Sequence, residues 1–163
     1  MTKTVYLSLG SNLGDREGNL RGAIEELKKL GAVAAVSSMY ETEPVEFTEQ
    51  PWFVNVAVEL QTELMPRQLL AAVLKIERDM GRRRLQPKGP RLIDIDVLLF
   101  GNTIMNDPQL TIPHPAMEQR RFVLVPLAEI APQARHPVSK KSIRELLAGL
   151  PKASPIVRKL SGA

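Results

Sequence analysis

Two carboxylates stand out within an otherwise apolar stretch, because Asp94 and Asp96 interrupt the run from Leu92 to Phe100. Side chains alternate between the two faces of a strand, so both aspartates are expected on one face. The other face would carry the apolar residues Ile93, Ile95, Val97 and Leu99. Neighbouring carboxylates repel each other, and a hard divalent cation such as Mg²⁺ relieves that repulsion by binding their oxygens. The pair predicts a magnesium site, against the alternative of an amphipathic strand with a solvated polar face.

Positive charge gathers immediately before this pair, in the segment from Arg82 to Arg91. Its cations are Arg82, Arg83, Arg84, Lys88 and Arg91. The planar guanidinium group donates two parallel hydrogen bonds and is well suited to phosphate. The segment has no Phe, Tyr or Trp for base stacking and leads into two acids, which disfavours a nucleic-acid contact. We predict a loop that closes over a polyphosphate, with a plain solvated loop as the other alternative.

An aromatic ring and an amide lie on one face of a further expected strand, at Phe53 and Asn55. A ring can stack on a flat heterocycle while an amide reads its edge with paired hydrogen bonds. The alternative is that Phe53 packs under a loop and Asn55 ends the strand pairing. Phe122 follows two arginines and could close the other side of a bound ring, but taken alone it is better explained by core packing at the start of a helix.

Single residues give weaker signals. His114 is flanked by prolines that restrict its backbone, which suits a side chain that donates to phosphate, or it is a surface histidine. Glu77 borders the apolar stripe of an expected helix. It is a solvated flank of that stripe, or it faces a nucleotide or holds an arginine. His136 is expected on the surface, and Trp52 is a loop aromatic without an assigned role.

The elements that must position these residues follow from hydrophobic periodicity. Strands are expected at residues 4–9, 33–42, 53–60 and 92–100, and helices up to about residue 30 and at 66–80, 121–130 and 142–150. The core order is strand, helix, strand, strand, helix, strand. This order predicts an α+β ferredoxin-like sandwich, with helices packed on one face of an antiparallel sheet and the C-terminal third added around it. We expect a single domain over residues 1–163.

The composition narrows the classes of chemistry. The 163 residues include no cysteine and only two histidines, which excludes disulfides, thiolate catalysis and histidine-rich metal centres. A metal would therefore need oxygen ligands. The net charge of +4 suits an anionic small molecule as well as nucleic acid. No apolar run is long enough to span a membrane and the N-terminus lacks signal-peptide features, so we expect a cytoplasmic protein without a membrane partner.

Taken together, these motifs resemble the 6-hydroxymethyl-7,8-dihydropterin pyrophosphokinase family, over nearly the whole chain. The most specific part is the run Gly-Pro-Arg-Leu-Ile-Asp-Ile-Asp-Val-Leu-Leu-Phe-Gly at residues 89–101. Supporting parts are Gly10-Ser11-Asn12, Tyr40-Glu41-Thr42-Glu43-Pro44, Gln50-Pro51 with Phe53 and Asn55, and Pro113-His114 followed by Arg120 and Phe122.

The resemblance implies a reaction and a role for each matching residue. ATP would give its terminal diphosphate to the hydroxymethyl group of the pterin, leaving AMP, and both substrates would be the only partners of a monomer that binds no nucleic acid. Two magnesium ions would be held by Asp94 and Asp96, with Arg82 and Arg91 assisting catalysis. The residues implied around ATP are Glu77, Arg84, Arg91, His114 and Arg120. Those implied around the pterin are Thr42, Val45, Phe53, Asn55 and Phe122.

Two departures from the family pattern limit what is carried over. Pro87-Lys88 stands where the family often has an Arg-Trp pair, and Pro115 stands where an aromatic is familiar. The general base is left open between Asp96 and a metal-bound water. The rival enzyme is a phosphokinase that makes ADP, and the rival from another class is a ferredoxin-like nucleic-acid-binding domain that uses the segment from Arg82 to Arg91.

Overall fold

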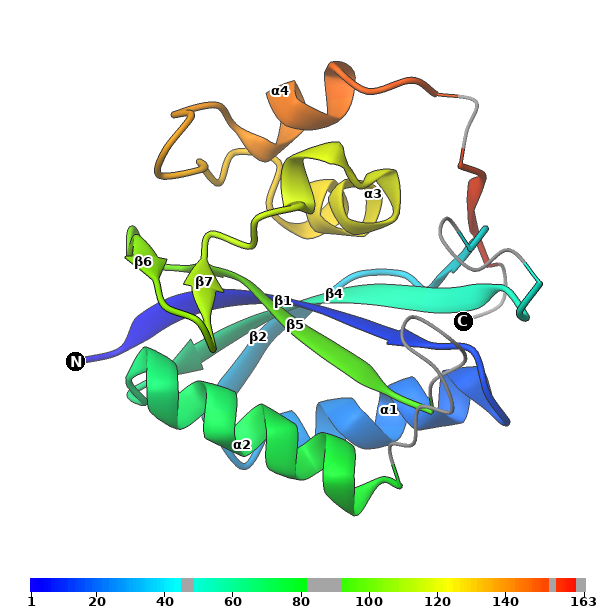
Figure 1. Ribbon diagram of the computed structural model, residues 1–163, viewed down its shortest axis with the longest axis horizontal. Helices are drawn as coiled ribbons and strands as arrows, with labels where there is room; N and C mark the ends of the chain where they lie inside the picture. Colours follow the sequence, from blue (N-terminus) through cyan, green and yellow to red (C-terminus); the bar gives the residue numbers. More distant parts are fainter. Residues whose placement is uncertain (45–48, 82–91, 153–154, 161–163) are drawn as a thin grey trace.

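The computed structural model describes residues 1–44, 49–81, 92–152 and 155–160 (Figure 1). Its elements are β1 (Lys3–Ser11), α1 (Arg16–Leu27), β2 (Ala32–Val36), β3 (Tyr40–Thr42), β4 (Phe53–Thr62), α2 (Pro66–Asp79), β5 (Asp94–Phe100), β6 (Met105–Asn106), β7 (Thr111–Ile112), a 3₁₀ turn η1 (Met117–Gln119), α3 (Arg121–Ile130), α4 (Ile143–Ala148) and β8 (Val157–Lys159). In this part of the chain, no helix is both long and apolar enough to cross a membrane.

Among the described residues, six strands form the main sheet in the order β5-β1-β4-β3-β8, with β2 also paired to β4. Every one of these pairings is antiparallel. The crossovers β1-α1-β2 and β4-α2-β5 each skip one strand, which is the split arrangement of the ferredoxin-like sandwich. The predicted fold class is confirmed, with the expected strand at 33–42 divided into β2 and β3.

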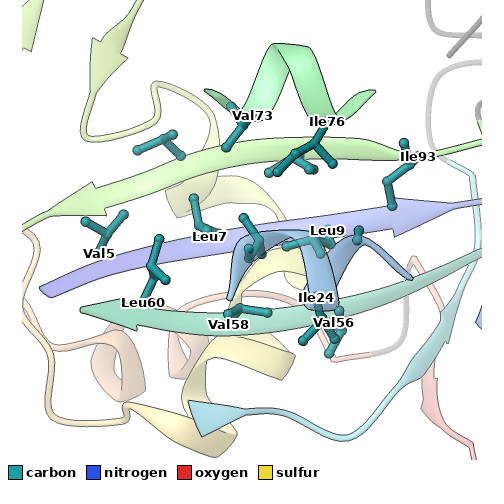
Figure 2. Packing of buried hydrophobic residues seen from close by; sticks show 14 of the residues in the cluster. Val5, Leu7, Leu9, Ile24, Val56, Val58, Leu60, Val73, Ile76 and Ile93 are labelled. Atoms are coloured by element: carbon teal, nitrogen blue, oxygen red, sulfur yellow. The ribbon is translucent and has the colours of Figure 1, made fainter. Parts of the chain in front are cut away.

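Helices cover both faces of this sheet (Figure 1). On one face, α1 and α2 bury a core that includes Leu9, Val56 and Ile76 (Figure 2). On the other face, α3 and α4 bury a second core that includes Leu98 and Leu124. The expectation of helices on one face therefore describes only the part of the fold up to β5, because the C-terminal additions form a second helical layer.

Alternation along β5 divides its side chains between the two faces. Ile93, Ile95 and Val97 belong to the core under α1 and α2, so Asp94 and Asp96 lie on the face of α3. The register then shifts, since Leu7 pairs with Val97 while Tyr6 pairs with Leu99, which makes a bulge. As a result Leu99 packs in the second core, and the expectation that it shares the face of Ile93 is wrong.

The turn from β1 into α1 is tied to the chain that precedes β4. Asn12 is buried, and its Nδ2 donates to Gln50 Oε1 at 2.8 Å and to the Pro51 carbonyl at 3.0 Å. Asp15 then caps α1 by accepting from the Gly18 amide at 3.1 Å. This turn therefore fixes where β4 begins relative to the end of β1.

Candidate active site

The strand register places Asn55, the amide predicted to bind the edge of a ring, in one row with the predicted metal ligand Asp94. On β1, Gly10 pairs with Asn55 of β4 on one side and with Asp94 of β5 on the other. Neighbouring strands lie about 4.8 Å apart, so Asn55 and Asp94 are roughly 10 Å apart on the same face. The next row places Ser8 between Ala57 and Asp96. The residues between the two predicted sites are therefore small.

Gly10 is small because side chains from β4 lie directly over it. A Cβ at this position would come within 2.7 Å of Asn55 Nδ2 and 3.5 Å of Phe53 Cδ1. The ring of Phe53 and the amide of Asn55 thus converge over Gly10, toward the carboxylates on the far side of β1. Sequence analysis placed Phe53 and Asn55 on one face, and the structure adds that this face is the one that carries Asp94.

The orientation of the Asn55 amide is set by its neighbours. Thr42 Oγ1 donates to Asn55 Oδ1 at 2.5 Å, and Asn55 Nδ2 lies 3.5 Å from the Leu9 carbonyl. Both Thr42 and Asn55 are buried. The predicted residues Thr42, Phe53 and Asn55 are therefore brought together as one wall of the site, the ring wall.

His114 reaches the carboxylates from the segment that follows β7. Its Nε2 lies 4.0 Å from Asp96 Oδ1, and its backbone N–H donates to the Leu98 carbonyl at 3.0 Å. The Ala116 amide donates to His114 Nδ1, so in the neutral ring the proton is assigned to Nε2, facing Asp96. Burial and the positive charge of Arg120 lower the pKa of His114, against an opposing effect of Asp94. The structure thus places the predicted residues Asp96 and His114 next to each other.

A cleft of about 240 Å³ opens beside β5, between α2 and the segment that contains β7. Its lining includes Asp96 and His114 together with Leu70, Ile95, Val97, Pro108, Gln109, Leu110, Thr111 and Pro115. Apolar side chains and the edge of a strand are suited to a flat base, and Asp96 stands at the polar end. Sequence analysis missed Leu70 and Leu110, because apolar residues that line a cleft have the same pattern as core residues.

Glu77 has a clear structural contact. It is 3% exposed on α2, and its Oε2 accepts a hydrogen bond from the Ile95 amide at 2.8 Å. The interpretation of Glu77 as a solvated flank is therefore wrong. Because Ile95 lies between Asp94 and Asp96, this bond holds the carboxylate strand against α2. A contact of Glu77 with ATP remains a prediction.

At the start of α3, the guanidinium group of Arg120 lies 5.5 Å from the centre of the Phe122 ring. Phe122 is half-buried and packs against the second core. The positive charge of Arg120 also contributes to the lowered pKa of His114. The pterin contact predicted for Phe122 stays a prediction.

Carboxylate oxygens are the ligands that magnesium prefers, and Asp94 and Asp96 supply them from one face of one strand. The side chain of Asp96 is 37% exposed, so part of it is in contact with solvent. In the described ranges, no cluster of three or more acidic or histidine side chains forms a closed cage. The donor set fits a magnesium ion that keeps water and phosphate oxygens as its remaining ligands.

Four predicted site residues, Val45, Arg82, Arg84 and Arg91, lie outside the described residues. One surface expectation is wrong, since His136 is 4% exposed and its Nδ1 accepts from the Val138 and Ser139 amides. Its side chain closes a turn, which a spacing pattern does not reveal.

Sequence analysis also missed the side chains that support the ring wall, Glu41 from the opposite face of the sheet and Glu129 from α3 beside it. Glu41 accepts from Arg16 and Arg158, and Glu129 accepts from Tyr40. Each partner is more than 20 residues away along the chain, so local spacing gives no sign of the pairing.

Fold and site together define a small ferredoxin-like α+β protein with an aromatic ring, a buried amide and a carboxylate pair on one face of its sheet. Its sequence matches the family described as 7,8-dihydro-6-hydroxymethylpterin-pyrophosphokinase (HPPK) over residues 6–132. The chain belongs to the HPPK family.

Several relatives are named 2-amino-4-hydroxy-6-hydroxymethyldihydropteridine pyrophosphokinase. The protein from Bacillus subtilis (strain 168) is 47% identical over 135 residues, which cover 82% of this chain and 81% of that relative. The protein from Methylorubrum extorquens is 46% identical over 147 residues, which cover 89% of this chain and 92% of that relative.

Among solved structures, Plasmodium falciparum HPPK-DHPS, wild type with pterin and p-hydroxybenzoate, is similar with a TM-score of 0.73 at 20% identity. The similarity covers 91% of this chain but only 43% of that longer one. At this level of identity it supports the fold alone.

Proposed function

We propose that this chain transfers the β,γ-diphosphate of ATP to the hydroxymethyl group of 6-hydroxymethyl-7,8-dihydropterin, a step of folate biosynthesis. The observation that carries the proposal is the row Asn55–Gly10–Asp94. In this row the buried amide of Asn55 and the carboxylate of Asp94 lie on the same face of the sheet, with Gly10, which has no side chain, between them. A two-ring heterocycle held by Asn55 can extend its hydroxymethyl group over Gly10 toward Asp94. Membership of the HPPK family supplies the particular ring.

The transfer makes one bond and breaks one. The hydroxymethyl oxygen bonds to the β-phosphorus, the bond from that phosphorus to the bridging oxygen of the α-phosphate breaks, AMP leaves, and the hydroxyl proton is released. In-line transfer depends on positioning and on neutralising charge at the transferring group. Two Mg²⁺ ions, when bound, would supply most of that positive charge. Asp94 and Asp96 would hold them, and their coordination would leave room for phosphate oxygens.

The cleft beside β5 is the proposed place of the adenine base. Apolar residues in its lining, among them Leu70 on α2 and Leu110 before β7, suit a flat ring. The phosphates would then run from the cleft past His114 toward Asp96. With Nε2 protonated, His114 can donate a hydrogen bond to a phosphate oxygen without carrying a charge of its own. The lowered pKa of His114 favours this neutral form.

Further parts of the proposal come from sequence. Arg82 and Arg91 are proposed to neutralise charge on the transferring phosphates, with Arg84 and Arg120 beside the nucleotide and Val45 beside the pterin. We also propose a monomer that acts in the cytoplasm. The general base is left as either Asp96 or a metal-bound water.

The direct test is the nucleotide product. The chain is mixed with ATP, MgCl₂ and 6-hydroxymethyl-7,8-dihydropterin, and AMP, ADP and the pterin ester are quantified. AMP formed in equal amount to a pterin diphosphate is expected. ADP with a pterin monophosphate would show transfer of the γ-phosphate and overturn the proposal. Absence of turnover, combined with salt-sensitive binding to polynucleotide that persists in Asp94→Ala/Asp96→Ala, would favour the nucleic-acid-binding alternative instead.

A further inference from the structure

Glu41 joins several segments behind the ring wall. It follows Tyr40 and precedes Thr42 on β3, so its side chain lies on the face opposite to Thr42. There Glu41 Oε2 accepts from Arg16 Nη1 at 3.0 Å, and Oε1 accepts from Arg158 Nε at 3.1 Å and Nη2 at 2.5 Å. Its side chain is only 15% exposed, whereas that of Arg158 is 64% exposed. Two arginines from opposite ends of the chain therefore converge on one carboxylate.

The same two arginines hold Trp52. The guanidinium group of Arg158 lies 5.3 Å from the centre of the Trp52 ring, and Arg16 Nη1 donates to the Trp52 carbonyl at 2.9 Å. Trp52 immediately precedes Phe53, the aromatic residue of the ring wall. Movement of Trp52 would therefore displace Phe53.

Backbone hydrogen bonds attach the C-terminal strand to the same place. Strand β8 pairs with β3 so that Arg158 lies opposite Glu41 and Val157 opposite Thr42. The pairing continues beyond the strand, because the Glu43 amide donates to the Ile156 carbonyl at 2.9 Å and the Ile156 amide donates to Glu43 Oε1 at 3.0 Å. Strand β8 thus covers the outer edge of β3. The family match ends at residue 132, so β8 lies beyond it.

We propose that β8 is a clamp for the pterin subsite, and that Arg158 is a positioning residue that acts through Glu41 and Trp52. The inference rests on the proposed function. Thr42 orients the Asn55 amide, and Phe53 follows Trp52 directly, so both sides of the ring wall are attached to the clamp. An exposed ion pair contributes little to overall stability. The ion pair between Glu41 and Arg158 acts instead on the position of the ring wall, because a displacement of about 1 Å in a binding site can strongly reduce binding and turnover.

The clamp is expected to affect one substrate only. The cleft proposed for adenine lies beside β5, and β1 and β4 separate β5 from β3 in the sheet. Loss of the clamp should therefore weaken pterin binding and leave nucleotide binding unchanged. A general loss of structure would weaken both.

The test uses Arg158→Ala in the full chain, with Lys28→Ala as control. Lys28 is an exposed partner of Glu25 on α1. Binding of 6-hydroxymethyl-7,8-dihydropterin in the presence of a non-hydrolysable ATP analogue is measured by calorimetry, and KM for each substrate is measured separately. In Arg158→Ala we expect pterin affinity to fall by about three- to tenfold. The variant loses both hydrogen bonds to Glu41 and the contact with Trp52, but it affects the pterin only through those two residues. KM for ATP and the thermal midpoint should stay close to those of the control.

Two further measurements make the result specific. Trp52 is the only tryptophan, so its fluorescence reports on the clamp directly and should change in Arg158→Ala but not in Lys28→Ala. Arg158→Lys keeps the charge but offers one donating nitrogen where Arg158 uses two, so it should recover part of the pterin affinity.

Unchanged pterin affinity in Arg158→Ala would overturn the clamp and leave the proposed function intact. Parallel loss of pterin and ATP affinity would overturn it as well, because that pattern indicates a general structural role. If the unmodified chain itself binds no pterin, the proposed function fails, and the clamp fails with it.

Discussion

At the residue scale, the proposed chemistry depends most on Asp94 and Asp96. Replacing either with Asn keeps the shape of the side chain and removes the charge that would bind magnesium. We expect kcat to fall at least about a hundredfold, since an interaction made at the transferring group is worth about 2.7 kcal/mol or more. The thermal midpoint should change little, because Asp96 is partly exposed and the apolar core under β5 is untouched.

The matched control is Asp79→Asn, on an exposed carboxylate that pairs with Lys75 on α2. It should retain normal turnover. Near-normal kcat in a folded Asp96→Asn variant would contradict the assignment of this pair as the metal site.

Thr42 provides a second prediction at this scale. Thr42→Val removes the hydroxyl that donates to Asn55 Oδ1 and keeps the branched shape of the side chain. A buried neutral hydrogen bond contributes about 1 kcal/mol, so KM for the pterin should rise by about fivefold while KM for ATP is unchanged. Thr42→Ser retains the hydroxyl and should behave like the unmodified chain. Equal kinetics for the Val and Ser variants would mean that the hydroxyl does not orient Asn55.

At the scale of elements, the side chains of β4 that lie over β1 require Gly10. An added Cβ in Gly10→Ala would lie 2.7 Å from Asn55 Nδ2, closer than atoms in contact normally come. We expect a loss of about 1–3 kcal/mol in the free energy of unfolding, together with a higher KM for the pterin. Urea titration and steady-state kinetics measure the two effects.

Gly22 on α1 is the matched control, because its added Cβ would lie at an ordinary 3.5 Å from Met80 Cε. Gly22→Ala should raise the free energy of unfolding by about 0.5–1 kcal/mol, as alanine favours helix. A Gly10→Ala variant as stable as the unmodified chain, with unchanged pterin KM, would show that the Asn55 side chain can move aside without consequence.

Elements with a strong local pattern were predictable from sequence. The expected helix at 121–130 agrees with α3, and alternation placed Asp94 and Asp96 on one face. The break between β2 and β3 was not predictable. Ser37 Oγ accepts from the Ala57 amide, so a side chain replaces a main-chain acceptor there, and this contact joins residues 20 positions apart in the chain. Strand β8 was missed because it is a short, polar edge strand whose partner lies far away in sequence.

At the scale of the whole molecule, Glu129 joins the α3 layer to the sheet beside the ring wall. Glu129 Oε1 accepts from the Tyr40 hydroxyl at 2.5 Å, and Oε2 accepts from the Ser38 amide at 2.8 Å and the Ser38 hydroxyl at 3.0 Å. Tyr40 lies opposite Asn55 in the register of β3 and β4. The second helical layer is thus attached to the strand pair that carries the pterin subsite, and the attachment uses an ionised carboxylate.

This attachment predicts how stability changes with pH. Burial acts to raise the pKa of Glu129, but hydrogen bonds from Tyr40 and Ser38 outweigh it, and the net pKa lies below the usual 4.5. The unfolded chain therefore takes up this proton at a higher pH than the folded chain. The stabilisation is present above about pH 4.5 and is lost as the pH falls through the lower folded pKa.

Glu129→Gln removes the titrating group. The difference in thermal midpoint between this variant and the unmodified chain should therefore be largest near pH 7 and should approach zero toward pH 3. Tyr40→Phe removes one of the hydrogen bonds that lower the pKa of Glu129. Its profile of thermal midpoint against pH should therefore lie between those of the unmodified chain and Glu129→Gln. Parallel profiles for all three proteins from pH 7 to pH 3 would show that the ionised form of Glu129 does not hold α3 to the sheet.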